Sequence, residues 1–310
     1  MVRGRRSTPA GEHRPVLLGE VLAALEPLAG AVVVDCTVGW AGHAVELLRR
    51  VGKDGRLMGL DLDAENLPRA RERLEACGGR YSLHHSNFAG LPAILTSGGI
   101  EQVDALVADL GISSMQVDDA ERGFSYTRNG PLDMRMDRSR GRTAAQVLAT
   151  IPEAELARAL HELGDEPDAE GVARLLVEAR ERGHLETTKQ LAGVLLQGQA
   201  WRLHPATDRW NTHPAARVFQ ALRILVNREL ANLESLLRVL PGVLRPGGRA
   251  AIISFHSGED RLVKSAFRSG LRSGVYAAIS PEPMRATLSE RDANPRSRSA
   301  KLRWARRIDS

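Results

Sequence analysis

The sequence predicts an α/β fold built around a mainly parallel β-sheet, with a helical domain inserted within it. Short apolar, β-branched runs alternate with helical patterns as far as residue 112, which is typical of strands joined by crossover helices. Residues 113–214 carry loops and amphipathic helical patterns but no strand pattern, and the alternation then resumes. We therefore expect one discontinuous domain over residues 1–112 and 215–310, and an inserted helical domain over residues 113–214.

The expected strands share one pattern, a short apolar run bounded by turn residues. They are Ala31–Asp35, Arg56–Asp61, Tyr81–His85, Val103–Asp109, Arg249–Phe255 and Lys301–Arg307. Apolar residues at helical spacing mark the expected helices. These are Val16–Leu28, Gly42–Val51, Ala64–Cys77, Pro152–Leu163, Glu170–Arg182, Thr188–Gln197, Ala215–Leu240 and Glu259–Ser269. This order predicts right-handed crossovers between parallel strands.

The composition is that of a globular protein, with 43% hydrophobic and 26% charged residues in a chain of 310. It excludes a largely disordered chain and a small scaffold built on disulfides. Cys36 and Cys77 lack metal-ligand spacing, so we expect no metal site and a reducing compartment. The charged start is followed by no apolar signal region, and no apolar run reaches the ~18 residues of a membrane span. We expect a cytoplasmic protein.

A glycine-containing turn after the first strand indicates a ligand site. Gly39 and Gly42 follow Asp35 where a strand passes into a helix. In doubly wound folds, ligands bind at the carboxyl ends of the strands, and glycines let the backbone approach them closely. Asp61 ends the next strand, near the spacing at which an acid binds ribose hydroxyls.

These residues leave the cofactor open between a dinucleotide and S-adenosylmethionine. A dinucleotide site requires G-x-G-x-x-G, which this turn lacks, so a nucleotide-dependent dehydrogenase is disfavoured. S-adenosylmethionine has cationic amino and sulfonium groups and no phosphate, which suits an acid at position 35 and the lack of a P-loop lysine. Asp109 ends the fourth strand, and the turn 244–249 precedes another, as in class I methyltransferases.

A longer signature begins at the end of the fourth strand. Asp109–Asp137 resembles the signature of the ribosomal RNA small subunit methyltransferase H family, the MraW-type 16S rRNA cytosine-N4 methyltransferases. Further blocks match in the same order, at His13–Leu18, Phe219–Ile224, Ile253–Arg261 and Asn294–Arg303. The resemblance implies a class I (Rossmann-like) S-adenosylmethionine-dependent methyltransferase fold, with the inserted helical domain recognising the substrate.

The resemblance also implies the residues that contact S-adenosylmethionine. Carried over position by position, they are Ala41, Gly42, His43, Asp61, Phe88, Asp109 and Gln116. The backbone at 41–43 would face the methionine moiety, Asp61 would hold the ribose, and Phe88 would offer an apolar face. Asp109 and Gln116 would bind the amino acid end or border the methyl-transfer pocket.

Methyl transfer to the N4 amine of cytosine needs a proton acceptor and close placement, because the N4 lone pair is delocalised into the ring. Asp109 is the expected acceptor. His256 is a second candidate catalytic residue, with the shaping of its loop as the alternative. Ser113 and Ser114 are expected either to bind the flipped cytosine or to cap a helix.

The expected partner is 16S rRNA in the 30S subunit, with the family's decoding-centre cytidine at rRNA position 1402 as the target. A net charge of +5 and two groups of arginines agree with RNA binding. The first group is Arg122, Arg128, Arg135, Arg138, Arg140 and Arg142, with Phe124 and Tyr126 for base stacking. The second group is Arg296, Arg298, Arg303, Arg306 and Arg307. The sequence leaves a homodimer open.

The chain departs from the family pattern at four places. One is an arginine that usually follows the acidic start at 164–171 and is missing near Gly171. Ala41 stands where the family usually has glycine, Gly258 where it usually has leucine, and Trp201–Asn211 looks like an addition. These departures motivate two alternatives: a diverged paralogue that methylates another RNA or amine, and a non-catalytic RNA-binding or ribosome-assembly protein. Cofactor binding separates the second alternative from the enzymes, and substrate preference separates the two enzymes.

Overall fold

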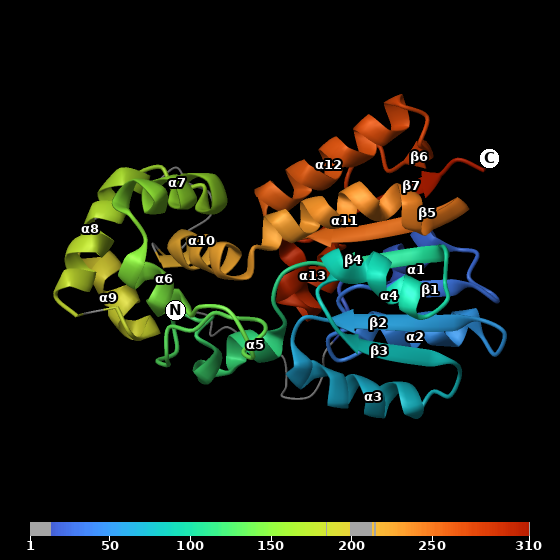
Figure 1. The fold of residues 1–310 in the computed structure, drawn as a ribbon, viewed down its shortest axis with the longest axis horizontal. Coiled ribbons are helices and arrows are strands. Elements are labelled where there is room, and N and C mark those ends of the chain that lie inside the picture. Colours follow the sequence, from blue (N-terminus) through green and yellow to red (C-terminus); the bar gives the residue numbers. More distant parts are fainter. Residues whose placement is uncertain (1–13, 184, 199–212, 214, 310) are drawn as a thin grey trace. The chain divides into compact units, whose positions relative to one another are not determined.

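The computed structural model describes residues 14–183, 185–198, 213 and 215–309. The chain forms two compact units (Figure 1). One joins Met1–Gly111 to Leu230–Ser310, and the other is Ile112–Glu229. We call them the sheet unit and the helical unit.

The sheet unit contains one seven-stranded sheet in the order β3-β2-β1-β4-β5-β7-β6. The strands are β1 (Val32–Asp35), β2 (Arg56–Asp61), β3 (Tyr81–His85), β4 (Val103–Asp109), β5 (Leu244–Ser254), β6 (Tyr276–Ile279) and β7 (Lys301–Arg307). The first five are parallel to one another, whereas β7 runs antiparallel to both β5 and β6. The predicted α/β class with a mainly parallel sheet is confirmed.

Helices cover both faces of this sheet (Figure 1). They are α1 (Leu18–Leu25), α2 (Gly42–Val51), α3 (Leu67–Glu75), α4 (Leu91–Ser97), α11 (Glu229–Val243) and α12 (Ser257–Arg272). A further short helix, α13 (Leu288–Ala293), buries none of its residues. Successive strand residues serve opposite faces, because Val33 packs with α1 and α2 while Val34 packs with α4 and α11. Burial on both faces explains why the strands read as continuous apolar runs.

The strand register brings three aspartates to one edge of the sheet. Asp35 pairs with Gly59 of β2, and Asp61 pairs with His85 of β3. Asp109 closes β4, which pairs with β1. These are the carboxyl ends of parallel strands, the edge at which doubly wound folds bind ligands.

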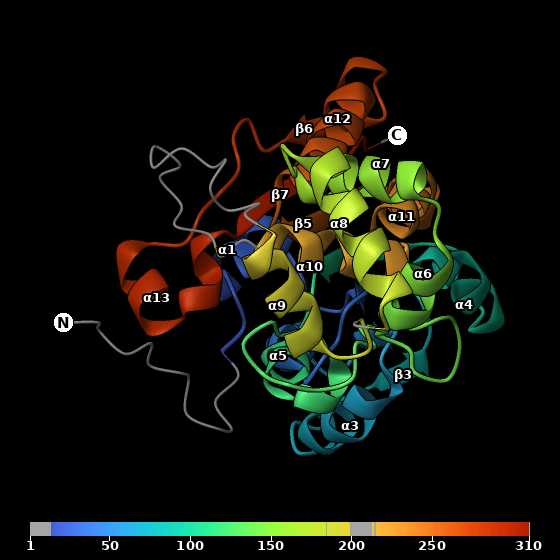
Figure 2. The same ribbon diagram turned by 90° about the vertical axis from the view of Figure 1, so that its left-hand side faces the viewer.

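The helical unit has its own core (Figure 2). Its helices are α5 (Ser114–Asp118), α6 (Ala144–Thr150), α7 (Glu153–Gly164), α8 (Ala169–Glu181), α9 (Thr188–Gln197) and α10 (Ala215–Asn227). Buried Leu160, Leu176 and Phe219 are part of this core. Thr143 and Thr187 begin α6 and α9 with capping boxes, in which each hydroxyl accepts from a backbone N–H three residues later.

The structure corrects the region after residue 214. The single helix expected over Ala215–Leu240 is two helices, because Arg228 adopts a left-handed conformation with φ 53° between α10 and α11. Helix α10 packs on α6, α7 and α9, so it belongs to the helical unit, which extends to Glu229. The short strand β6 was missed. The Trp201–Asn211 region lies outside the described residues.

Candidate active site at the carboxyl edge of the sheet

Three aspartates at the carboxyl edge are desolvated. Asp35 and Asp61 are buried, and the side chain of Asp109 is 20% exposed. Burial raises the pKa of Asp35 and of Asp61 to about 6. Burial also raises the pKa of Asp109 to about 7, against a lowering by the positive charge of Arg296. Burial removes the water that would stabilise these carboxylates. A cationic ligand stabilises their charged form in its place, so this edge favours such a ligand.

The turn between β1 and α2 is fixed by Asp61. Its Oδ2 accepts a hydrogen bond of 2.7 Å from the N–H of Gly39, and its Oδ1 accepts one of 2.8 Å from Asp63 N. The amide of Asn66 lies 3.3 Å from the same Oδ1. Asp61 therefore shapes the glycine turn from the neighbouring strand, in addition to its expected role with a ribose.

Ala41 occupies a position suited to glycine. It precedes α2 with φ 61° and ψ 33°, and its side chain is fully buried. An L-residue other than glycine pays about 1 kcal/mol for this left-handed conformation. The left-handed backbone thus explains why the family usually has glycine at this position. In this chain, burial of the Ala41 methyl group offsets part of the strain.

His43 lies between the N-terminal segment and Asp109. Its Nε2 donates a hydrogen bond of 2.9 Å to the carbonyl of Val16, so Nδ1 is the free acceptor of the neutral ring. That Nδ1 lies 3.9 Å from Asp109 Oδ2. Burial lowers the pKa of His43, which favours the neutral ring. His43 therefore gives Asp109 no full positive charge.

One oxygen of Asp109 is left without a partner. Its backbone N–H donates to Thr37 Oγ1 at 2.7 Å, which ties the end of β4 to the turn after β1. Its Oδ1 is buried and accepts no hydrogen bond from any described residue. A buried carboxylate oxygen without a donor is costly, which agrees with the raised pKa of this carboxyl.

His256 and Glu259 form a pair at the start of α12. The His256 Nε2 lies 3.3 Å from Glu259 Oε1 but outside hydrogen-bond geometry, and both side chains are buried. Glu259 Oε2 accepts from Phe255 N at 2.8 Å. The charge of Glu259 raises the pKa of Asp109, which places the pair at the same edge. A side chain at Gly258 would meet the His256 ring at 3.2 Å, so this departure leaves the ring room.

The remaining predicted ligand residues have different surroundings. Gly42 begins α2 beside Ala41, and Phe88 begins a short 3-10 turn after β3, half-buried against the apolar cluster of α4 and α11. Gln116 belongs to the helical unit. Its Oε1 accepts from Ser113 N at 2.9 Å, and Ser113 Oγ caps α5 in return. The capping role considered for Ser113 is therefore present.

Sequence reasoning missed Thr37 and Asn66, which orient the backbone of Asp109 and the carboxylate of Asp61. Both hold other site residues through hydrogen bonds between strands or turns. Their residue types are common in loops, so only the sheet order could reveal these contacts.

Several arginines expected at the RNA surface also make contacts within the protein. Arg122 is 3% exposed and donates to the carbonyls of Arg135 and Met136. Other arginines pair with nearby acids of their own unit. These pairs are Arg128–Asp118, Arg135–Asp133, Arg140–Asp137, Arg303–Asp260 and Arg306–Asp309. Phe124 is buried, and Tyr126 stacks on His213 with centroids 4.6 Å apart.

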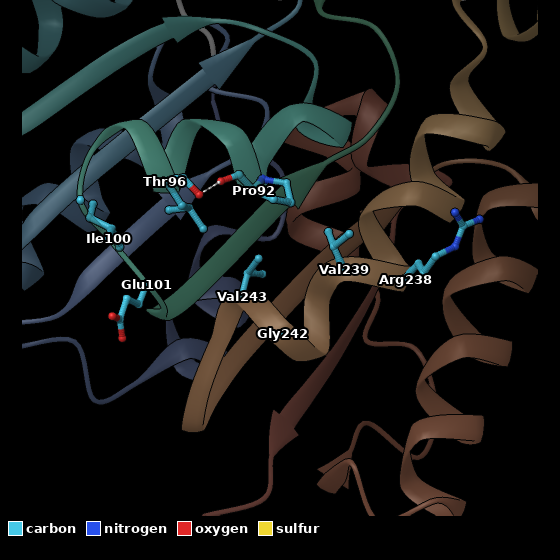
Figure 3. A pocket seen from close by; sticks show the side chains of 10 residues that line it. Pro92, Thr96, Ile100, Glu101, Arg238, Val239, Gly242 and Val243 are labelled. Carbon is cyan, nitrogen blue, oxygen red and sulfur yellow. Dashed lines mark hydrogen bonds between the residues drawn. The ribbon is translucent and has the colours of Figure 1, made fainter.

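A separate hollow opens at the opposite edge of the sheet (Figure 3). It has a volume of about 640 Å³ and lies between the end of α4 and the end of α11. Ile100 and Val243, which line it, stand just before β4 and β5 begin. It is therefore at the amino ends of these strands and is not part of the aspartate edge. Among the described residues, no cluster suited to a metal ion and no membrane-spanning helix was found.

The sequence profile of the MraW methylase family matches residues 10–308. The chain belongs to this family. It is 46% identical to ribosomal RNA small subunit methyltransferase H of Citrifermentans bemidjiense, over 96% of this chain and 98% of the relative. It is 43% identical to the protein of that name from Sorangium cellulosum, over 97% and 92% of the two chains.

The residues of this MraW methylase fit the family's methyl donor, S-adenosylmethionine. The donor carries a sulfonium and an amino group, and the edge offers Asp35, Asp61 and the unpartnered Oδ1 of Asp109. Phe88 adds an apolar side chain just after β3. The site is thus an edge with desolvated acids of one sign, as expected for a small cationic ligand.

Binding of S-adenosylmethionine is expected to tighten as pH rises from about 5 to 8. A cationic ligand favours the ionised acids, so carboxyls with pKa values of about 6 and about 7 must lose protons when it binds. Below these values, affinity falls by up to about tenfold per pH unit for each such carboxyl. Calorimetric titrations at several pH values test this for the wild type and Asp61→Asn.

The comparison with Asp61→Asn isolates Asp61, because the ligand's own amino group titrates alike with both proteins. The variant should bind more weakly at pH 8 and lose the step near pH 6. Equal pH slopes for the two proteins would contradict the assigned role.

Proposed function

We propose that this chain is a cytoplasmic S-adenosylmethionine-dependent methyltransferase that modifies the N4 amine of cytidine 1402 in 16S rRNA of the small ribosomal subunit. The observation that carries the proposal is the 46% identity with a ribosomal RNA small subunit methyltransferase H, in an alignment that covers 96% of this chain and 98% of that relative. The aspartate edge supports the same conclusion, because it offers both a cation site and a proton acceptor.

Asp109 accepts the proton in the proposed mechanism. When bound, S-adenosylmethionine supplies an electrophilic methyl group. Methylation leaves the N4 nitrogen with one proton to lose, and Oδ1 of Asp109 lacks a donor among the described residues. A carboxyl with a pKa of about 7 can take that proton and release it to water near neutral pH.

His43 and Thr37 position Asp109 for this step. Thr37 Oγ1 holds its backbone, and the neutral ring of His43 lies beside Oδ2 without adding a positive charge that would weaken the base. His256 stays a candidate catalytic residue in the proposal. Its contact with Glu259 supports a positioning role. In this role His256 keeps Glu259 near Asp109, and the negative charge of Glu259 keeps the pKa of Asp109 raised.

The test is methyl transfer from labelled S-adenosylmethionine to 30S subunits that lack this modification, followed by nucleoside mass spectrometry. We expect N4-methylcytidine at position 1402. Transfer to another nucleotide would favour a diverged paralogue, and cofactor binding without transfer to any 30S site would also overturn the stated substrate. Sedimentation of the purified chain tests the homodimer that the sequence leaves open.

A further inference from the structure

A second hollow lies within the helical unit, lined by residues where α6 ends and α7 begins and by the end of α10. Its volume is about 410 Å³, within the range of small-ligand sites. Val147 and Ile151 form a buried apolar part, and Leu225 and Val226 are half-exposed. The hollow therefore offers apolar surface to a flat group that enters from solvent.

Two arginines at this hollow form no ion pair with any described residue. Arg142 and Arg228 are both exposed, and Glu155 is the acid that lines the hollow with them. In contrast, Arg128, Arg135 and Arg140 of the same unit pair with aspartates. The hollow thus carries positive charge that is available to an anion.

One of the two guanidinium groups is positioned by a hydrogen bond. Arg142 Nη1 donates a hydrogen bond of 2.8 Å to Thr150 Oγ1, which also lines the hollow. Arg228 has φ 53°, a conformation that costs an L-residue free energy and is uncommon for arginine. Strained residues gather at binding sites, where the surrounding structure holds them. Arg142 is therefore held near the hollow before a ligand arrives, and Arg228 has an unusual backbone conformation at its rim.

We propose that this hollow binds one unpaired nucleotide of the RNA substrate, away from the cytidine that is methylated. Arg142 and Arg228 bind its phosphate, and the apolar residues contact the face of its base. Glu155, also at the hollow, can accept a hydrogen bond from an exocyclic amine, which cytosine, adenine and guanine have and uracil lacks. The inference rests on the proposed function and specifies how its substrate is held.

The direct test is the anisotropy of a labelled ten-nucleotide single-stranded RNA, titrated with the full chain. Arg142→Gln and Arg228→Asn each remove a charge, and asparagine tolerates the left-handed conformation at position 228. We expect each to weaken binding about fivefold and to lower the salt slope by about 0.7. Oligocytidine should bind more tightly than oligouridine, and Glu155→Gln should reduce that preference.

Arg182→Gln is the matched control. It removes the same charge from an exposed site at the end of α8, where Arg182 lies 3.8 Å from Glu178. The control should change affinity less than twofold. An equal loss in all three arginine variants would overturn the proposal, since net charge alone would then account for binding. Binding of a free nucleotide at the hollow that the RNA does not displace would overturn the proposal as well.

Two further measurements separate this proposal from the proposed function. Thr150→Val keeps the shape of the hollow but removes the hydroxyl that holds Arg142, so it should raise KM for 30S subunits with little change in kcat. If the wild type makes N4-methylcytidine and the variants at Arg142, Thr150 and Arg228 have the same KM for 30S subunits as the wild type, the hollow is not a substrate site. If pocket-dependent RNA binding persists without any methylation of 30S subunits, the pocket stands and the proposed reaction fails.

Discussion

Asp109→Asn is expected to lower kcat for methyl transfer by about a hundredfold or more, the usual contribution of a positioned proton acceptor. Asparagine preserves the shape of the side chain but cannot accept the N4 proton. In the wild type, kcat should rise with pH and level off above pH 7, because the base must be ionised and burial raises its pKa to about 7. Single-turnover rates between pH 5.5 and 8.5 measure both effects.

The variant should lack the pH dependence that belongs to Asp109. Asp54→Asn is the control, since Asp54 is an exposed residue just before β2, away from the carboxyl ends of the strands. It should leave both the rate and the pH profile unchanged. Full turnover of Asp109→Asn would show that another group, or water alone, accepts the proton.

The three aspartates of the site could be predicted because each stands at the end of a strand. Asp35, Asp61 and Asp109 each close an apolar run, and parallel strands bring their carboxyl ends to one edge, so sequence order was enough to group them. The same reasoning located six of the strands, five of them within one residue at each end. The exception is β5, which begins at Leu244 within the segment expected to be a turn. Short-range pattern and chain direction determine these features together.

What the sequence did not reveal depends on contacts between distant residues. Ion pairing decides which arginines have unpaired guanidinium groups. Neither the pairing of Arg303 with Asp260 nor the burial of Arg122 leaves a periodic pattern in the sequence. The break at Arg228 was hidden because the apolar pattern continues from α10 into α11. Strand β6 has only four residues and is stabilised by pairing with β7. In each case tertiary packing decided the outcome.

Gly130→Ala is expected to destabilise the helical unit by about 3 kcal/mol. A Cβ at position 130 would lie 1.8 Å from the carbonyl oxygen of Ala120, a backbone atom that cannot move aside as a side chain can. Gly130 also exchanges hydrogen bonds with Thr188: its N–H donates to Thr188 Oγ1, and its carbonyl accepts from Thr188 N. The clash would separate this loop from the start of α9.

Hydrogen exchange followed by mass spectrometry measures this effect unit by unit. Opening made easier by about 3 kcal/mol should speed exchange of the protected amides in residues 112–229 by about a hundredfold. Peptides from the sheet unit should exchange as in the wild type, because the clash lies wholly within the helical unit.

Gly193→Ala provides the matched control in the same unit. A Cβ there meets no atom within 4 Å, and the residue lies inside α9 with ordinary helical backbone. Alanine should therefore stabilise that helix by about 0.5–1 kcal/mol and slow its exchange. If both glycine variants changed exchange in the same direction, the requirement for glycine at position 130 would not come from its close approach to Ala120.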